Sequence, residues 1–317
     1  MCRLKKWYTR LVPLLLVFCF HLLCGAQKNA VKTVKARDNA PVQKSLLWEI
    51  SGNGITKPSY LFGTMHIICK NDALLSKALE KIIANASAIY LELDMDNMTE
   101  LLGAFNYMNM TGDKKLSDYL TADEVKRVES WFQQNQPLIP VSMLERMKPI
   151  FLSSMIGEKG FDCEQQDGME MRIMEEASKN DKEIKGLETM AYQAGIMDSI
   201  PYDIQAKELM KSIDSSNTPD SSLSVLVDLY KKQDIEALDT LMNRTEGLMG
   251  KYNEFLLYRR NRNWVQKIKE LTKHNNYLFA VGAGHLPGIK GVIALLRKEG
   301  FTVKPVNNVW QMPADEM

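Results

Sequence analysis

Residues 59–66 read Ser-Tyr-Leu-Phe-Gly-Thr-Met-His, and residues 276–285 read Asn-Tyr-Leu-Phe-Ala-Val-Gly-Ala-Gly-His. In each stretch an apolar run typical of a strand leads into Gly-x-x-His, at Gly63–His66 and again at Gly282–His285. Glycine permits the tight turn or close backbone approach that a chain needs on leaving a strand. The repeat therefore predicts two similar strand ends, each followed by a histidine.

The elements that follow the two motifs are expected in the same order. After the first motif, the pattern predicts a helix over residues 72–84, capped by Asp72, and a strand at Ala88–Asp94. After the second, it predicts a helix at Pro287–Lys298 and a strand at Phe301–Val306, separated by a terminating glycine. We interpret these as two strand–helix–strand (βαβ) units related by a divergent internal duplication.

The expected fold class is therefore α/β, with the N- and C-terminal βαβ units pairing in one mainly parallel sheet. A further strand at residues 45–51 leads into the first unit through a Gly-Asn-Gly hairpin turn. A large helical insertion, about residues 97–271, separates the two units. No linker divides the chain, so residues 44–317 are expected to form a single domain after a flexible polar segment at 27–43.

The N-terminus has the pattern of a secretory signal peptide. Residues 1–10 contain four basic and no acidic residues, Leu11–Leu23 is apolar, and the small pair Gly25-Ala26 follows. The apolar run is shorter than the roughly 20 residues that span a bilayer, so cleavage after Ala26 is expected. The alternative is a lipoprotein attached to the membrane through Cys24. Both interpretations make this an exported protein, periplasmic or secreted.

Export changes the charge and the cysteine count. Four of the 40 basic residues leave with the leader, so 36 remain against 39 acidic residues and the net charge becomes −3. That charge gives no reason to expect nucleic acid as a partner. The cysteines that remain, Cys69 and Cys163, form no CxxC pair and suggest no disulfide framework, so we expect them to be unpaired or only incidentally paired. The sequence leaves the oligomeric state open.

The two motif histidines are expected to share one site. Parallel sheets bind ligands beyond the carboxyl ends of their strands, and His66 and His285 both follow such ends. The other two histidines are poor candidates, because His21 leaves with the leader and His274 lies in a polar turn.

Glu92 is the carboxylate expected to join them. Alternation along its strand places Glu92 with Tyr90 and Asp94 on one face. Strands of a parallel sheet are covered on both faces, so a carboxylate there needs a metal, a histidine or an arginine as partner. The alternative is an edge strand with one solvated face.

Two more charged residues are candidates. Arg260 lies one turn before Trp264 on the buried side of a helix predicted over Tyr252–Leu271. An arginine there meets a carboxylate or an anionic group of a substrate, and a purely structural pairing with a buried acid explains the position equally well. Glu188 is expected to open a helix, where the helix dipole alone favours a carboxylate.

Five segments, in this order along the chain, resemble the TraB/GumN family: Tyr60–His66, Tyr90–Asp94, Gly186–Thr189, Leu256–Trp264 and Val281–Gly288. The resemblance covers about residues 45 to 311. It implies membership of a group that includes the Tiki metalloproteases and, more remotely, erythromycin esterases and an iron-regulated haem-binding lipoprotein. The family's two histidines, glutamate and arginine correspond here to His66, His285, Glu92 and Arg260, with Glu188 as a further acidic position. Where many relatives have Gly-x-Asp, this chain has Gly168-Met169-Glu170, which leaves the role of Glu170 in doubt.

The function implied is that of a metal-dependent hydrolase acting on a peptide or small-molecule substrate. His66, Glu92 and His285 would hold a divalent ion such as Zn²⁺, Mn²⁺ or Co²⁺, since two imidazoles and a carboxylate suit such ions and leave a position for water. Two alternatives stay open. One is a metal-independent, esterase-like hydrolase in which a histidine oriented by Glu92 acts as general base. The other is a non-catalytic protein that binds a peptide or haem.

Overall fold

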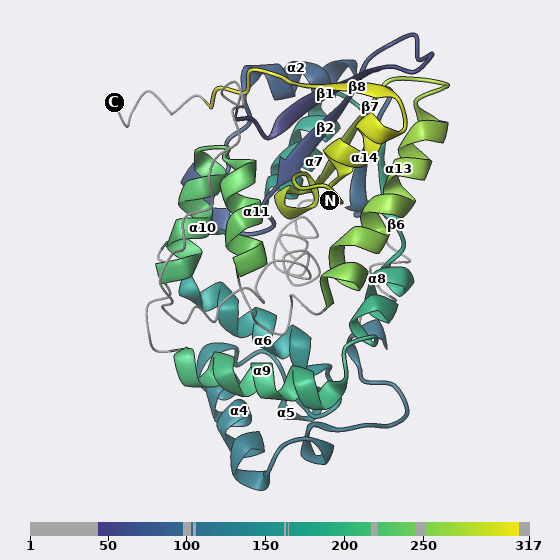
Figure 1. The fold of residues 1–317 in the computed structure, drawn as a ribbon. Coiled ribbons are helices and arrows are strands. Elements are labelled where there is room, and N and C mark those ends of the chain that lie inside the picture. The colour runs from purple at the N-terminus through teal and green to yellow at the C-terminus, as the bar shows by residue number, and fades with distance from the viewer. Residues whose placement is uncertain are drawn as a thin grey trace.

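Six strands form the main sheet, in the order β6-β4-β7-β2-β1-β8 (Figure 1). The computed structural model describes residues 44–97, 103, 106–161, 163, 165–216, 221–244 and 252–310. The expected signal peptide, Cys24 and the polar segment 27–43 lie outside this part of the chain. The strands are β1 (Leu47–Gly52), β2 (Ser59–Thr64), β4 (Ala88–Leu93), β6 (Ile184–Glu188), β7 (Tyr277–Gly282) and β8 (Phe301–Pro305).

The sheet is mainly parallel, as the sequence predicted. Strands β6, β4, β7 and β2 run in one direction, and β1 is antiparallel to both of its neighbours, β2 and β8. Strand β2 pairs directly with β7, so that Gly63 lies opposite Val281 and Thr64 opposite Gly282. The two Gly-x-x-His motifs therefore leave the sheet side by side, at the carboxyl ends of β2 and β7.

The strands of each expected βαβ unit are not neighbours in this sheet. Strand β7 lies between β2 and β4, while β2 and β1 lie between β7 and β8. The sheet is thus built by interleaving the N- and C-terminal strands, and the arrangement as two self-contained units is not confirmed. Strand β6 comes from within the segment expected to be helical and forms the edge beside β4.

Two helix starts differ from the prediction. Helix α2 runs from Lys77 to Asn85, and Ser76 caps it by accepting a hydrogen bond from the backbone N–H of Leu79. Asp72, the expected cap, belongs instead to a short 3-10 turn and pairs with Lys231. Helix α14 begins only at Val292, because the chain first turns through Gly288, whose φ of +79° suits glycine.

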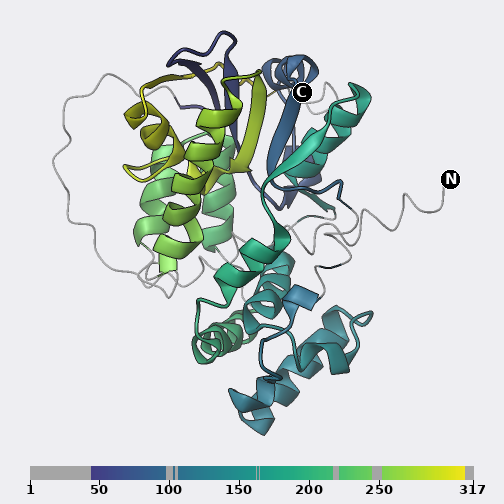
Figure 2. The same ribbon diagram turned by 90° about the vertical axis from the view of Figure 1, so that its right-hand side faces the viewer.

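The remaining helices surround the sheet and extend below it (Figures 1 and 2). Those within the described ranges include α4 (Ala122–Asn135), α5 (Val141–Leu144), α6 (Pro149–Gly157), α7 (Met169–Lys179), α8 (Met190–Met197), α9 (Tyr202–Ser215), α10 (Ser221–Lys231), α11 (Ile235–Arg244) and α13 (Arg259–Leu271). Apolar side chains form one core around the sheet and a second core among α4, α6 and α9. No helix in the ranges that the structure describes is long and apolar enough to cross a membrane.

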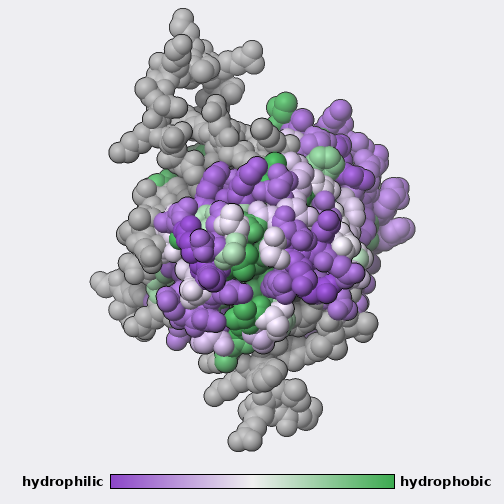
Figure 3. Space-filling view, turned by 90° about the horizontal axis from the view of Figure 1, so that it is seen from below, coloured by the Kyte–Doolittle hydropathy of each residue, from purple (hydrophilic) through white to green (hydrophobic). Residues whose placement is uncertain are grey.

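The helical part below the sheet presents some apolar surface. Figure 3 views the molecule from this side and shows apolar residues gathered at the centre of a mostly hydrophilic face. The large exposed apolar residues between α4 and the end of α5 include Leu138 and Met143.

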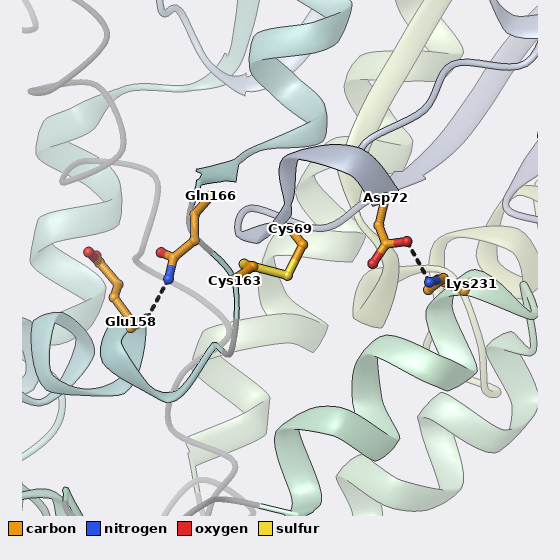
Figure 4. Close-up of a disulfide and its surroundings, with 6 residues drawn as sticks. All are labelled: Cys69, Asp72, Glu158, Cys163, Gln166 and Lys231. Atoms are coloured by element: carbon orange, nitrogen blue, oxygen red, sulfur yellow. Dashed lines mark hydrogen bonds and ion pairs between the residues drawn. A yellow bond between two sulfur atoms is a disulfide. The ribbon is translucent and has the colours of Figure 1, made fainter. Parts of the chain in front are cut away.

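Cys69 and Cys163 form a disulfide, which settles a pairing that the sequence left open (Figure 4). Their Cα atoms lie 5.8 Å apart across 94 residues of sequence. Cys69 ends the short strand β3 (Ile68–Cys69), which pairs antiparallel with β5 (Gln166–Asp167). The sequence did not predict this pairing, because the spacing of two distant cysteines does not show whether the fold places them within bonding distance.

We expect loss of this disulfide to lower the free energy of unfolding by about 2–5 kcal/mol, because it closes a long loop in the unfolded chain. The measurement is urea unfolding of the Cys69→Ser/Cys163→Ser protein beside the oxidised wild type. The single variants Cys69→Ser and Cys163→Ser should each lose as much as the double variant. Equal stability of oxidised and cysteine-free proteins would contradict the prediction.

Candidate functional site

The candidate site lies where the parallel strands end. His66 follows β2, Glu92 lies near the end of β4, Glu188 is the last residue of β6, and His285 follows β7. Helix α13 contributes Arg260. These five side chains are all buried, with at most 8% of each residue exposed. The structure therefore brings the sequence-predicted residues to one edge of the sheet.

Arg260 connects the acidic residues of this cluster. Its Nη2 pairs with a Glu92 oxygen and lies 2.8 Å from Glu188 Oε2, and its Nε donates to the same Glu188 oxygen at 2.9 Å. Its Nη1 donates to the carbonyl oxygen of Leu256 at 3.2 Å, and its guanidinium carbon lies 4.7 Å from the ring centre of Trp264. An arginine with this many fixed contacts is held in one orientation.

Glu92 finds the partner that its buried position requires. Strand β4 lies between β6 and β7, so the alternative of a solvated edge strand is wrong. Besides Arg260, Glu92 accepts a hydrogen bond from the backbone N–H of Gly282 at 2.8 Å. Gln193 on α8 donates to Glu92 at 3.3 Å and to Glu188 at 3.2 Å, which joins the two carboxylates.

The two carboxyl groups have pKa values shifted in opposite directions. Burial disfavours the ionised form of Glu92, but Arg260, His285 and His66, with the Gly282 N–H, outweigh it and hold the pKa of Glu92 well below its ordinary value. Burial raises the pKa of Glu188, and the attraction of Arg260 offsets this only in part. Glu92 is therefore the permanent anion, while Glu188 is the group better suited to exchanging a proton.

His285 is held as one neutral tautomer. Its Nδ1 lies 2.5 Å from Asn261 Oδ1, and the amide nitrogen of Asn261 donates to the Lys290 carbonyl at 2.9 Å, so the amide oxygen faces the ring. Nδ1 is therefore the donor, and Nε2 carries a lone pair 3.3 Å from Arg260 Nη1 and 3.8 Å from Glu92 Oε1. Burial and the positive charge of Arg260 lower the pKa of His285 to about 3. The nearby His66 adds a smaller effect in the same direction, and Glu92 opposes the shift.

His66 has a similar arrangement with a carboxylate in place of the amide. Its Nδ1 lies 2.7 Å from Glu170 Oε1, in the first turn of α7, and both side chains are at most 4% exposed. The two atoms are close, but they are not aligned as a hydrogen bond. Glu170 therefore places a carboxylate against the Nδ1 side of the His66 ring.

Three site residues were not assigned a role from sequence. Glu170 was left in doubt, and the structure places it on His66. Asn261 was noted only as the neighbour of Arg260, yet it orients His285. Gln193 is buried between the two carboxylates. Glu188 was expected to open a helix, but it ends β6, and Thr189 caps α8 instead.

The ligand atoms that this cluster offers suit a divalent ion, but they are not arranged around a common position for one. Two imidazole nitrogens and a carboxylate are suitable ligands, and the His285 ring is oriented through its other nitrogen, as metal-bound histidines commonly are. Within the described ranges, however, no group of three or more His, Cys, Asp or Glu side chains is arranged to hold a metal ion. Arg260 lies against the Glu92 carboxylate that such an ion would need.

The class of protein follows from a comparison of the chain with known protein families. The model of the TraB/PrgY/gumN family matches residues 46–305, and the chain belongs to that family.

Curated relatives are distant but match most of the chain. The "Metalloprotease TIKI homolog" of Amphimedon queenslandica is 23% identical, over 87% of this chain and 64% of its own length. "Metalloprotease TIKI1" of Danio rerio is 21% identical, over 91% and 69% of the two chains, and "Metalloprotease TIKI2" of the same organism is 18% identical, over 92% and 67%. The matches thus span about two thirds of the relatives' length. No solved structure matches the chain significantly.

Proposed function

We propose that this chain is an exported hydrolase that cleaves a peptide or ester bond at the cluster of His66, Glu92 and His285. The observation that carries the proposal is the position of the two histidines: they follow the paired parallel strands β2 and β7 and lie in one buried cluster with the ionised Glu92 and with Arg260. The distant relatives named as metalloproteases support the reaction class. The Cys69–Cys163 disulfide supports export, because disulfides persist mainly in oxidising compartments.

His66, Glu92 and His285 are the residues that would hold a divalent metal. Such an ion, when bound, supplies Lewis acidity and lowers the pKa of its water. Asn261 Oδ1 accepts the Nδ1–H of His285, so that the lone pair of that ring is on Nε2, and Glu170 lies against Nδ1 of His66. Gln193 and the Gly282 N–H hold the Glu92 carboxylate in place.

Arg260 and Glu188 supply the charge and the proton. The guanidinium is a fixed positive charge beside His285, where it stabilises negative charge that develops on a carbonyl oxygen of the substrate. Glu188, with its raised pKa, takes up or returns a proton during bond cleavage. The contact of Arg260 with Glu92 also favours a metal-free variant, in which a histidine Nε2 acts as general base.

The test compares His66→Ala, His285→Ala and the double variant with His274→Ala, which removes an exposed histidine in a polar turn. Metal content is measured after purification, and cleavage is measured on panels of peptides and esters with added Zn²⁺, Mn²⁺ or Co²⁺. We expect the site variants to lose metal and at least about 100-fold in rate, whereas His274→Ala keeps both.

The outcomes separate the proposals. Full metal content in the double variant, with activity lost, would exclude a metal site at the two histidines and support the metal-free hydrolase. If activity survives in the double variant, the cluster is not the hydrolytic site. Absence of any cleavage, with haem absorbance that depends on His66, would identify a binding protein instead.

A further inference from the structure

The first Gly-x-x-His motif leaves the sheet where the pairing of β1 with β2 is interrupted. The register pairs Leu47 with Phe62, so Leu46 and Gly63 are the next pair along this ladder. Opposed residues at such a position of an antiparallel ladder exchange two backbone hydrogen bonds. Here the N–H of Gly63 donates to the Leu46 carbonyl at 2.9 Å, while the N–H of Leu46 and the carbonyl of Gly63 bond to side chains. The last rung of the ladder is therefore half open.

The two side chains that fill this rung come from the turn between α10 and α11 (residues 230–234, the α10–α11 turn). The Tyr230 hydroxyl donates to the Gly63 carbonyl at 3.0 Å, and the N–H of Leu46 donates to Gln233 Oε1 at 3.1 Å. Helices α10 and α11 lie side by side next to the sheet (Figure 1). A turn far along the chain thus supplies partners for two groups that would otherwise bond to each other.

Both side chains of the α10–α11 turn are fixed. Tyr230 is fully buried. Burial and the charge of Glu170 raise the pKa of Tyr230 well above its ordinary value, although the Met65 N–H acts in the opposite direction, so the hydroxyl keeps the proton that it donates. Gln233 Oε1 also accepts a hydrogen bond from Asn308 Nδ2 at 3.0 Å. The turn is therefore a firm support for the end of β2.

Gly63 is also the point at which the two motif segments touch. A Cβ atom at Gly63 would lie 2.7 Å from Cδ1 of Leu286 and 3.1 Å from Cα of Ala283, so a side chain there would press on the loop after β7. Helix α11 contacts the same loop: a Cβ atom at Gly288 would lie 3.3 Å from the Asp239 carboxylate. The α10–α11 pair thus reaches both motif segments.

The open rung changes the course of the chain after Gly63. Strand β2 keeps its pairing with β7 for one more residue, with Thr64 opposite Gly282. A closed rung would hold this segment beside β1 as well, on the side away from β7. The side chains that fill the rung therefore help to set where His66 begins.

We propose that the α10–α11 turn is a positioning element of the candidate site, in which Tyr230 and Gln233 hold the last β1–β2 rung open and direct the first motif toward the second. The inference rests on the proposed function in taking His66 and His285 as partners in one reaction. Tyr230 and Gln233 are positioning residues, because they act through the backbone that leads to His66.

Two variants test this inference by backbone amide hydrogen exchange in the metal-free full chain. Tyr230→Phe removes the hydroxyl and keeps the ring, and Gln233→Gly removes the amide while suiting the left-handed φ of +54° at that position. In both variants the amides of residues 63–66 should exchange at least about 10-fold faster than in the wild type, because a bond that restrains the motif is lost. The kcat of hydrolysis should fall about 10–100-fold while KM changes little, since a small displacement of a reacting group slows the chemical step.

Tyr202→Phe is the matched control, because it removes a hydrogen-bonded hydroxyl beside the second core. That hydroxyl donates to Asp198 Oδ1 at 2.5 Å and accepts from the N–H of Thr111 at 3.0 Å. The control should lower the midpoint of urea unfolding about as much as Tyr230→Phe. Exchange of the motif amides and kcat should both stay at their wild-type values.

The outcomes separate positioning from support of the fold. Equal exchange of the motif amides in Tyr230→Phe and Tyr202→Phe would overturn the inference, whatever the hydrolytic rate. Faster exchange with an unchanged kcat would overturn it too, because the turn would then support the fold and not the reaction. If the wild type cleaves no substrate but the motif amides respond as expected, the proposed function fails and the placement of the motif by the turn stands.

Discussion

Replacing Arg260 by methionine should lower the free energy of unfolding by about 3–5 kcal/mol, the cost of removing one partner from a buried ion pair. The side chain is 1% exposed and neutralises Glu92 and Glu188, which are themselves buried. Without it, two carboxylates face each other with Gln193 as their shared donor. The measurement is urea unfolding at neutral pH.

The neighbouring Arg259 provides the matched control, because it is exposed on the same helix. Arg259→Met should change stability by no more than about 0.5 kcal/mol. Adding Glu92→Gln to Arg260→Met removes one of the orphaned charges, so the double variant should recover part of the loss. If the double variant loses as much free energy of unfolding as Arg260→Met and Glu92→Gln lose together, Arg260 and Glu92 do not interact. That result would contradict the ion pair between them.

Arg260→Lys tests geometry apart from charge. Lysine keeps the positive charge but cannot present the planar fork that contacts Glu92, Glu188 and the Leu256 carbonyl together. Its stability should therefore fall between those of the wild type and Arg260→Met. A metal-holding role for Glu92 would show in the same variants, because releasing Glu92 from Arg260 should strengthen binding of Zn²⁺.

The parts of the fold that local pattern determines could be predicted from sequence. Strands β2, β4, β7 and β8 lie within a residue or two of their expected positions, because short apolar runs bounded by glycine are typical of strands. The sequence also predicted that the two motif-bearing strands belong to one sheet and end on the same side of it, but not that β2 pairs directly with β7. Both predictions rest on neighbouring residues in the chain.

What could not be predicted depends on contacts between distant segments. Nothing local requires β7 to lie between β2 and β4, so the strand order stayed open. Strand β6 is short and lies within a helical segment; Gly186 is needed there because a Cβ atom would lie 2.7 Å from the backbone nitrogen of Asp94. That requirement exists only once the two strands are side by side.

In the candidate site, too, local pattern predicted some features, while others depend on contacts between distant segments. Alternation along β4 showed that Glu92 faces a covered side and needs a partner, but it could not choose among a metal, a histidine and an arginine. The amphipathic pattern of α13 likewise placed Arg260 on the buried side. The contact of Glu170 with His66 depends on how α7 docks, which residue spacing does not reveal.

Acidification should destabilise the protein from about pH 6.5 downward, because His285 is buried in its neutral form. Its pKa is about 3 in the folded chain and has its ordinary value of 6.5 in the unfolded chain. Between these values the unfolded chain binds a proton that the folded chain does not, so stability is lost as the pH falls through this window. The slope from His285 alone is about 1.4 kcal/mol per pH unit. Glu92 adds to the loss below pH 4.5, because its folded pKa is also lowered, while the raised pKa of Glu188 acts in the opposite direction.

The contribution of His285 is isolated by comparing how steeply the free energy of unfolding changes with pH in different variants. Absolute stabilities cannot be compared directly, since any substitution at this site also alters them. His285→Gln cannot gain a proton in either state, so its unfolding free energy should vary less between pH 6.5 and 4.5 than that of the wild type, by about 1.4 kcal/mol per pH unit. His274→Ala removes an exposed histidine and should leave the slope unchanged. Equal slopes in His285→Gln and the wild type would mean that His285 accepts its proton inside the folded site. In that event Arg260 does not keep the ring neutral, and His285 becomes a base that works near its ordinary pKa, which favours the metal-free mechanism over one in which His285 is a metal ligand.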